Sequence, residues 1–289
     1  MSENKIMNKV AAIQISSTNN VDENLQTATK LIAEACMNGA KLIVLPEMFA
    51  IMGFTATDSV AVQETFGEGK IQNFLASQAK KHHVWIVGGT IPVKSENPNK
   101  IRAACLVYND QGQVVARYDK AHLFDATICP VECYRESNTA EPGDELVIVE
   151  TPFGKLGLAV CYDLRFSEIF IEFMKQGVEL IAVSAAFVEK TGIAHWHALL
   201  RARAIENFSY VIASNQWGTH ASQRKTYGHS LIVDPWGKII DEMQQPANGV
   251  VYGEVDLDYL REKRKSIPVL AHMKKLTVSI NDGISSVKK

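Results

Sequence analysis

Short apolar runs alternate along the chain with stretches whose apolar residues recur at helical spacing. Residues 10–15 and 41–45 have the composition of buried strands. Between them, residues 21–37 gather their apolar side chains on one helical face, and Gly39 provides a typical helix end. A strand, a helix and a second strand in succession predict a sheet with helices packed on it.

The same alternation extends over most of the remaining sequence. Further strands are expected over residues 84–93, 103–108, 113–118, 146–150, 155–160, 178–186, 210–214, 230–233, 238–241 and 250–255. Further helices are expected over residues 69–83, 166–177, 198–207 and 258–265. Residues 48–68 and 127–144 lack clear periodicity and are expected to be irregular. No repeat or linker divides the chain, so we expect a single α/β domain over residues 1–289, with its core at about 8–276 and a flexible tail over 277–289.

The composition narrows the class of protein. Of the 289 residues, 46% are apolar and 21% are charged, and the formal net charge is −2. This profile is typical of a globular protein and gives no electrostatic reason to bind nucleic acid or a membrane. No apolar run is long enough to span a bilayer, and the polar start of the chain lacks the apolar core of a secretory signal. Five cysteines without disulfide-framework spacing predict reduced thiols and a cytoplasmic protein.

Three chemically active side chains follow three of the expected strands. Glu47 comes just after the strand at 41–45, Lys120 after the strand at 113–118, and Cys161 directly after the strand at 155–160. The carboxyl ends of strands are where open α/β sheets form their ligand crevices. Each residue alone has a simpler interpretation, either a solvated loop residue or an inert buried thiol. A helix that begins just after Cys161 would favour its thiolate.

A carboxylate, an ammonium and a thiol together suit attack on a carbonyl or nitrile carbon with expulsion of nitrogen. Glu47 can accept the thiol proton and return it to the leaving nitrogen, and it can then activate water against the thioester. Lys120 can stabilise the developing oxyanion. Because a carboxylate beside a thiol opposes thiolate formation, we expect proton transfer from Cys161 to be concerted with attack.

Three segments carry a resemblance that covers residues from about 10 to about 276. They resemble the three signatures of the carbon–nitrogen hydrolase (nitrilase) superfamily. The segments are Leu-Pro-Glu ending at Glu47, Asp-Lys-Ala-His-Leu around Lys120, and Val-Cys-Tyr-Asp-Leu-Arg-Phe around Cys161. The resemblance implies a Glu–Lys–Cys triad, a four-layer α-β-β-α sandwich, no metal or organic cofactor, and dimers. It also implies that Glu136 orients the lysine and that the backbone N–H of Tyr162 is a second oxyanion donor.

Other segments resemble the Nit-type amidases within this superfamily. They are Gly-Ile-Ala-His-Trp at 192–196, Tyr-Gly-His-Ser at 227–230 and Pro-Trp-Gly at 235–237. In that branch the positions of Arg165, Phe187 and Thr191 bind the carboxylate or keto-acid end of the substrate, and an arginine fork suits a carboxylate. Ile193 replaces the usual proline and makes the local loop shape less certain, whereas His195 and Trp196 are interpreted as packing residues.

The resemblance implies a small-molecule substrate whose primary amide is hydrolysed to acid and ammonia through a thioester. Deaminated glutathione is favoured, because residues 215–220 and 224–229 look more like that branch and add basic side chains such as Arg224 for a distant carboxylate. The alternatives are α-ketoglutaramate (an ω-amidase reaction), nitrile hydrolysis and N-carbamoyl hydrolysis.

Two other classes of function compete with an amidase. A catalytically inactive scaffold would be expected to lose a triad residue, and none is missing. A redox-active cysteine protein would need Cys129 or Cys133 as a resolving thiol, and the same two cysteines lack the second Cys/His pair of a zinc site. We also expect a homodimer or larger even oligomer, because the helix at 166–177 carries more apolar residues than one buried face needs, namely Phe166, Ile169, Phe170 and Phe173.

Overall fold

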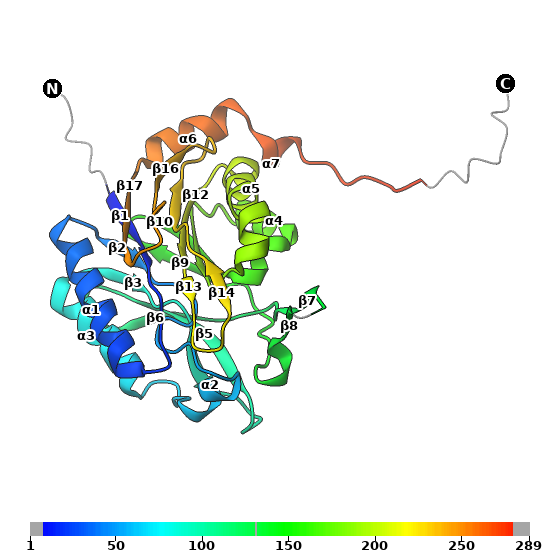
Figure 1. Cartoon of the computed structure of the whole chain (residues 1–289). Coiled ribbons are helices and arrows are strands. Elements are labelled where there is room, and N and C mark those ends of the chain that lie inside the picture. The colour runs from blue at the N-terminus through cyan, green and yellow to red at the C-terminus, as the bar shows by residue number, and fades with distance from the viewer. Residues whose placement is uncertain (1–7, 131, 280–289) are drawn as a thin grey trace, which may run out of the picture.

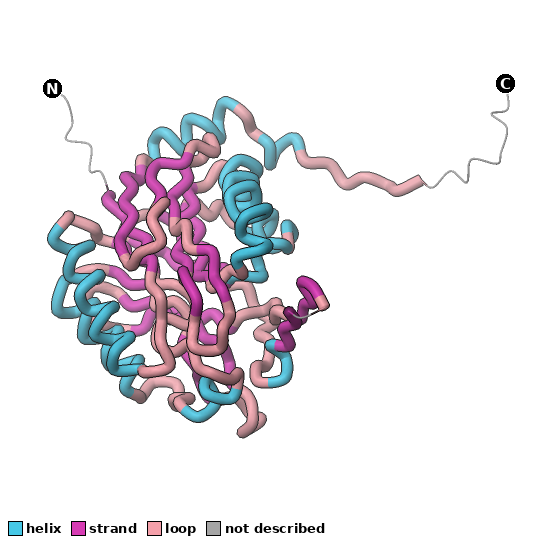
Figure 2. Tube along the Cα trace, in the orientation of Figure 1, coloured by secondary structure: helices cyan, strands magenta, loops and turns pink. Residues whose placement is uncertain are grey.

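The computed structural model describes residues 8–130 and 132–279. Two β-sheets lie at the centre of the molecule, with helices on their outer sides (Figures 1 and 2). The first sheet has the order β17-β1-β2-β3-β5-β4, and β6 pairs with β5. Its strands are β1 (Asn8–Gln14), β2 (Leu42–Val44), β3 (Trp85–Val87), β4 (Ile91–Lys94), β5 (Ile101–Tyr108), β6 (Val114–Asp119) and β17 (Gly249–Val255).

The second sheet has the order β16-β15-β12-β11-β10-β9. The central strands β10, β11 and β12 are parallel, and the remaining pairings are antiparallel. These strands are β9 (Ile148–Thr151), β10 (Gly154–Val160), β11 (Leu180–Ala185), β12 (Tyr210–Asn215), β15 (Leu231–Val233) and β16 (Ile239–Glu242).

Helices α1 (Val21–Met37) and α3 (Lys70–His82) cover the first sheet, and α4 (Ser167–Lys175) and α5 (Glu189–Asn207) cover the second (Figure 1). Alternation within β1 shows how the layers form: Val10 and Ala12 belong to the core cluster that includes the second sheet, whereas Ala11 and Ile13 pack in the cluster with α1 and α3. The four-layer α-β-β-α sandwich expected from the resemblance is therefore confirmed.

Several expected elements have different bounds in the structure. Residues 84–93 form two strands, β3 and β4, rather than one. The chain turns at Gly88 and Gly89, and Gly89 has the left-handed φ of 61°. A Cβ at Gly89 would collide with the backbone carbonyl oxygen of Pro46, so only glycine allows this close approach beside Glu47.

Two segments expected to be irregular contain regular structure. Residues 127–144 contribute to a hairpin, β7 (Asp125–Cys129) and β8 (Glu132–Arg135), followed by the 3₁₀ turn η1 (Glu136–Asn138). Residues 48–68 contain the short helix α2 (Thr57–Ala61). Neither segment has the long apolar period by which such elements are recognised in a sequence.

Helix α5 begins at Glu189 rather than at residue 198, so the region around Ile193 is helical and not a loop. The hairpin β13 (Trp217–Thr219) and β14 (Lys225–Tyr227) was not expected and lies near α5. The C-terminal part contains α6 (Leu257–Ser266) and the short α7 (Val269–His272), after which the chain extends away from the body (Figure 1). Of the expected tail, residues 277–279 are exposed coil, and 280–289 lie outside the described residues.

The apolar residues of the helix at 166–177 do not support an oligomer in the way that the sequence suggested. Ile169, Phe170 and Phe173 of α4 are all buried within one chain, where Phe170 and Phe173 join the core beneath the second sheet's helices. Across the described residues, every helix is too short or too polar to cross a bilayer.

Candidate active site

The ends of β2, β6 and β10 bring the three expected residues together. Lys120 is only 1% exposed, and its ammonium donates to Glu47 Oε1 at 2.7 Å. The other carboxylate oxygen of Glu47 accepts from the backbone N–H of Ala186 at 2.8 Å. Cys161 is 5% exposed, and its thiol lies within hydrogen-bonding reach of the Glu47 carboxylate. Residues distant in the sequence therefore form one compact Glu–Lys–Cys cluster.

Glu136 joins this cluster from the turn η1. Lys120 Nζ lies 2.9 and 2.7 Å from its two carboxylate oxygens, and Oε2 also accepts from the backbone N–H of Phe124 at 2.6 Å. The ammonium is thus held between two carboxylates.

Cys161 adopts an uncommon backbone conformation for a residue with a side chain. Its φ is 47°, at the point where β10 ends and the 3₁₀ turn η2 (Cys161–Arg165) begins. A left-handed conformation persists only where the surroundings fix it. Here the fully buried Asp163 carboxylate accepts from the Val160 N–H at 2.8 Å and from the Tyr118 hydroxyl at 2.7 Å.

His122 completes this support. Its backbone N–H and its Nδ1 both lie near Asp163 Oδ1, at 3.2 and 2.8 Å, and its ring stacks on Phe166 with centroids 3.6 Å apart. The segment that contains Lys120 and the turn that contains Cys161 are therefore joined through Asp163. The sequence analysis missed this role of Asp163, although an acidic residue beside an apolar strand is a recognisable signal.

The charges of the cluster stabilise one another. Burial alone favours neutral Glu47, but the positive charges of Lys120 and Arg224 outweigh burial and hold the pKa of Glu47 below its ordinary value. Burial likewise opposes the charged form of Lys120, yet Glu136 and Glu47 hold the pKa of Lys120 above its ordinary value. Both groups are therefore charged at neutral pH.

The thiol behaves differently. Burial and the charge of Glu47 raise the pKa of Cys161, and Lys120, Arg224 and the N–H of Ala186 oppose this rise only in part. The thiol is therefore neutral at pH 7 and needs a base at the moment of attack, as the sequence analysis expected.

A cavity of about 730 Å³ opens onto Glu47, Lys120, Glu136 and Cys161. Part of its wall is apolar and part is basic. The basic side chains are Arg135 of β8, Lys190 of the first turn of α5, Arg224 just before β14 and Lys225 of β14. Glu132 and Glu189 also line the cavity, and Glu132 pairs with Lys190 at 2.8 Å. Arg224 donates to the carbonyl oxygen of Ala186 at 2.6 Å and lies over the Tyr134 ring, 5.1 Å from its centroid. This volume suits a small molecule, and Arg224, whose charge acts on both Glu47 and Cys161, can pair with an anionic group of it.

Three residues expected to bind substrate do not line this cavity. The Arg165 guanidinium lies over the Phe187 ring, 5.2 Å from its centroid, and 3.2 Å from His195 Nδ1. Phe187 is buried against Trp196, and the Thr191 hydroxyl donates to the Val188 carbonyl oxygen. Trp196 is fully buried, as expected of a packing residue. The Tyr162 N–H lies at the start of η2, where backbone donors lack partners within the helix.

Comparisons with known proteins agree with this fold. The family model described as Carbon-nitrogen hydrolase matches residues 9–265. Proteins named deaminated glutathione amidase from Dictyostelium discoideum and Yersinia enterocolitica are 38% and 39% identical, over 93% and 91% of this chain and 96% and 92% of theirs. The crystal structure of Saccharomyces cerevisiae Nit3, a member of branch 10 of the nitrilase superfamily, is 31% identical with a TM-score of 0.82, over 91% of this chain and 95% of that one.

The chain is a carbon–nitrogen hydrolase of the nitrilase superfamily, of the Nit-type amidase branch. It is accordingly an enzyme that hydrolyses carbon–nitrogen bonds, as the sequence predicted.

Proposed function

We propose that Cys161, Glu47 and Lys120 are the catalytic triad and that the reaction passes through a thioester on Cys161. Glu47 takes the thiol proton while the sulfur attacks the amide carbon, and the proton then goes to the nitrogen as the carbon–nitrogen bond breaks. Water next attacks the thioester, with Glu47 again accepting a proton, and the acid leaves as the thiol is restored. The contact of the Glu47 carboxylate with both Cys161 and Lys120 supports these roles.

Lys120 and the Tyr162 N–H are proposed as the donors to the oxyanion. Lys120 is charged and buried, so its attraction for a developing negative charge is little screened by water. Glu136 is proposed as the positioning residue for Lys120, because both its oxygens lie within 3 Å of the ammonium, at 2.9 and 2.7 Å.

For the substrate we propose deaminated glutathione. The observation that carries this choice is the basic wall of the cavity, with Arg224 near Cys161 and Glu47, together with the names of the similar proteins. A substrate with a keto-acid end and a distant glycine carboxylate needs cationic groups at both ends of the pocket. The amide nitrogen of deaminated glutathione carries the rest of the molecule, so it leaves as an amine. The expectation of a primary amide and of ammonia release, made from the sequence, therefore does not apply to this substrate and applies only to a primary amide such as α-ketoglutaramate.

The deciding measurement compares kcat/KM for deaminated glutathione and α-ketoglutaramate, with detection of the released amine and of ammonia. We expect deaminated glutathione to be preferred. Arg224→Ala should raise its KM roughly 10- to 100-fold, because one charge-assisted contact to a carboxylate is lost. A preference for α-ketoglutaramate would instead indicate an ω-amidase. If Cys161→Ala still hydrolysed both compounds, the thioester mechanism would be excluded.

Arg165→Ala is the matched control, because the branch assigns substrate binding to this position while the cavity places Arg224 on its wall. If KM rose for Arg165→Ala and did not change for Arg224→Ala, Arg165 would be the residue that binds the substrate carboxylate. Phe187 and Thr191 would then be the neighbouring substrate-binding residues.

We propose further that the protein is a single-domain, cytoplasmic homodimer. Cys36, Cys105, Cys133 and Cys161 form no disulfide in the structure, which suits a reducing compartment. Apolar side chains stay exposed on the outer side of the second sheet, among them Ile205 of α5 and Trp236. A second copy would cover such residues.

A further inference from the structure

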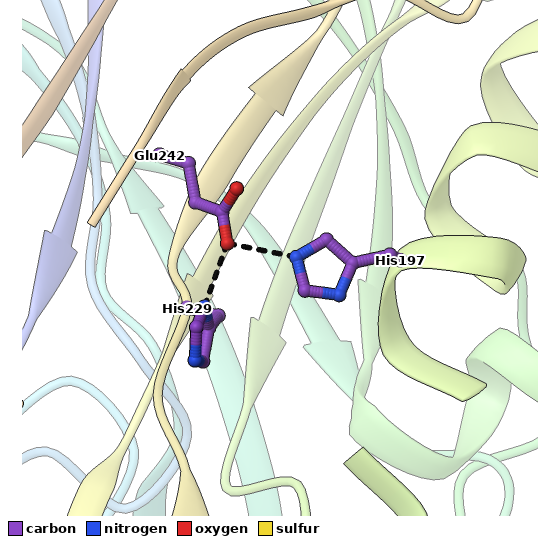
Figure 3. A group of neighbouring side chains, drawn as sticks. All are labelled: His197, His229 and Glu242. Atoms are coloured by element: carbon purple, nitrogen blue, oxygen red, sulfur yellow. Dashed lines mark hydrogen bonds and ion pairs between the residues drawn. The ribbon is translucent and has the colours of Figure 1, made fainter. Parts of the chain in front are cut away.

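A group of two histidines and a glutamate lies outside the catalytic cavity. His197 Nε2 is 2.8 Å and His229 Nδ1 is 2.6 Å from the same oxygen, Glu242 Oε1, and the three side chains point toward one another (Figure 3). None of the three lines the cavity around Cys161. The triad mechanism makes no use of them.

Three different elements hold these side chains in place. His197 lies on α5, His229 in the connection from β14 to β15, and Glu242 at the end of β16, where it pairs with Leu231. His229 has a left-handed φ of 54°, and its carbonyl oxygen accepts from the Trp196 indole at 2.8 Å. The ring of His229 also stacks on Tyr227 with centroids 4.3 Å apart. The cluster is therefore fixed by packing rather than assembled from mobile loops.

The donor set and its spacing fit a transition-metal ion. Two imidazoles and one carboxylate are a common ligand set for Zn²⁺ with one position left for water. Their ligand atoms all lie within 4.8 Å of one another. A tetrahedral ion with bonds of about 2.0–2.1 Å separates its ligands by about 3.3 Å, so each ring nitrogen has to move about half an ångström away from Glu242 Oε1 to admit the ion between them. The side chains are 31%, 29% and 14% exposed, which admits water as the fourth ligand.

We propose that His197, His229 and Glu242 bind one divalent transition-metal ion such as Zn²⁺, in a site separate from the active site. The bound ion stabilises the wall of the catalytic cavity by holding the elements that form it together. Helix α5 supplies Glu189 and Lys190 to that wall from its first turn, and β14 supplies Lys225. An ion that ties α5 to the β14–β15 connection and to β16 limits how far these elements can move apart.

The test measures binding of Zn²⁺ and Co²⁺ alone to the full chain in the Cys161→Ala background, so that the active-site thiol cannot bind metal. We expect one equivalent at micromolar free metal, a Co²⁺ spectrum without a sulfur-to-metal charge-transfer band, and a higher Tm with Zn²⁺. His197→Ala, His229→Ala and Glu242→Gln should each weaken binding at least about ten-fold. His195→Ala, on the same helix outside the cluster, should bind as before.

Glu242→Gln keeps the shape and hydrogen-bonding capacity of the side chain, so it separates loss of a ligand from loss of the fold, and the Tm without metal checks this. The proposal is overturned if no metal binds at micromolar concentration. It is also overturned if binding persists in all three variants, or if the Co²⁺ spectrum shows sulfur ligation, which would place the metal at Cys129 or Cys133.

Discussion

Cys161 keeps its proton until the substrate arrives, since burial and the neighbouring charge of Glu47 raise the pKa of its thiol. This distinguishes it from cysteine nucleophiles that rest as a thiolate beside a cation. In the proposed mechanism, the Glu47 carboxylate that disfavours the thiolate is also the base that removes the proton. The thiolate then forms only as the sulfur attacks the substrate.

The neutral thiol can be observed directly. In a pH titration of thiolate absorbance, the difference between wild type and Cys161→Ala should show no ionisation below pH 9, because the pKa of Cys161 lies above the ordinary value of 9.0. The other four cysteines cancel in the difference. A thiolate step near neutral pH would contradict the electrostatics of the site and favour a resting ion pair with Lys120.

The two charged partners of Cys161 should each be indispensable to turnover. Glu47→Gln removes the proposed base and Lys120→Ala removes the proposed oxyanion donor, so each should lower kcat roughly 100-fold or more. Circular dichroism establishes that each variant is folded. Glu136→Gln keeps hydrogen bonds to Lys120 and serves as the comparison, with a smaller loss in kcat. Near-normal turnover in either main variant would remove that residue from the triad.

At the scale of elements, the active site depends on how strand ends are held. The turn after β3 passes so close to Pro46 that position 89 has no room for a Cβ. The Met48 N–H, on the other side of Glu47, donates to the Thr90 hydroxyl at 2.9 Å. The Gly88–Gly89 turn therefore forms part of the support of Glu47, the proposed catalytic glutamate.

Gly89→Ala should consequently damage both stability and activity. Its φ of 61° disfavours alanine, and the collision with Pro46 adds to that strain and shifts Glu47. Gly177→Ala is the matched control, because Gly177 also has a positive φ of 76° but open space around it. We expect the control to lose about 1 kcal/mol of unfolding free energy at full kcat. Equal effects in the two variants would show that the contact with Pro46 has no influence on catalysis.

At the scale of the whole molecule, the apolar residues that remain exposed bear on assembly. Ile205 and Trp236 lie near each other, since Gly237 beside Trp236 closely approaches the Ile205 side chain. The chain also extends beyond α7 with Leu276 and Val278 exposed (Figure 1). The exposed apolar residues of this extended segment, and the pair Ile205 and Trp236, are suited to contact with a second copy of the chain.

Sedimentation at micromolar concentration should therefore give a species of twice the 32.0 kDa chain mass, or a larger even multiple. Ile205→Glu should shift it toward the single chain, because a charge would be buried in the interface. Met37→Glu changes an exposed apolar residue at the end of α1 and should leave the mass unchanged. A single-chain mass for wild type would exclude the homodimer.

The sequence by itself determined the layered α/β fold and the cluster of Glu47, Lys120 and Cys161. The spacing of apolar residues depends only on neighbouring positions in the chain, so the sequence alone identified α1 and most strands. The fold then brings the ends of these strands together, and with them the three residues. Glu136 required the resemblance to known signatures, because it lies in a segment without periodicity. The single domain over the whole chain stays a prediction.

Only the tertiary structure decided what surrounds the cluster. Asp163 meets Tyr118 across 45 residues of sequence, and Glu47 meets the Ala186 N–H across 139. Arg224 lines the cavity and Arg165 does not, although the resemblance assigned substrate binding to Arg165. His197, His229 and Glu242 likewise meet from three elements. The physical reason is that such contacts depend on how whole elements pack, and no local pattern of apolar and polar residues encodes the packing of elements far apart in the chain.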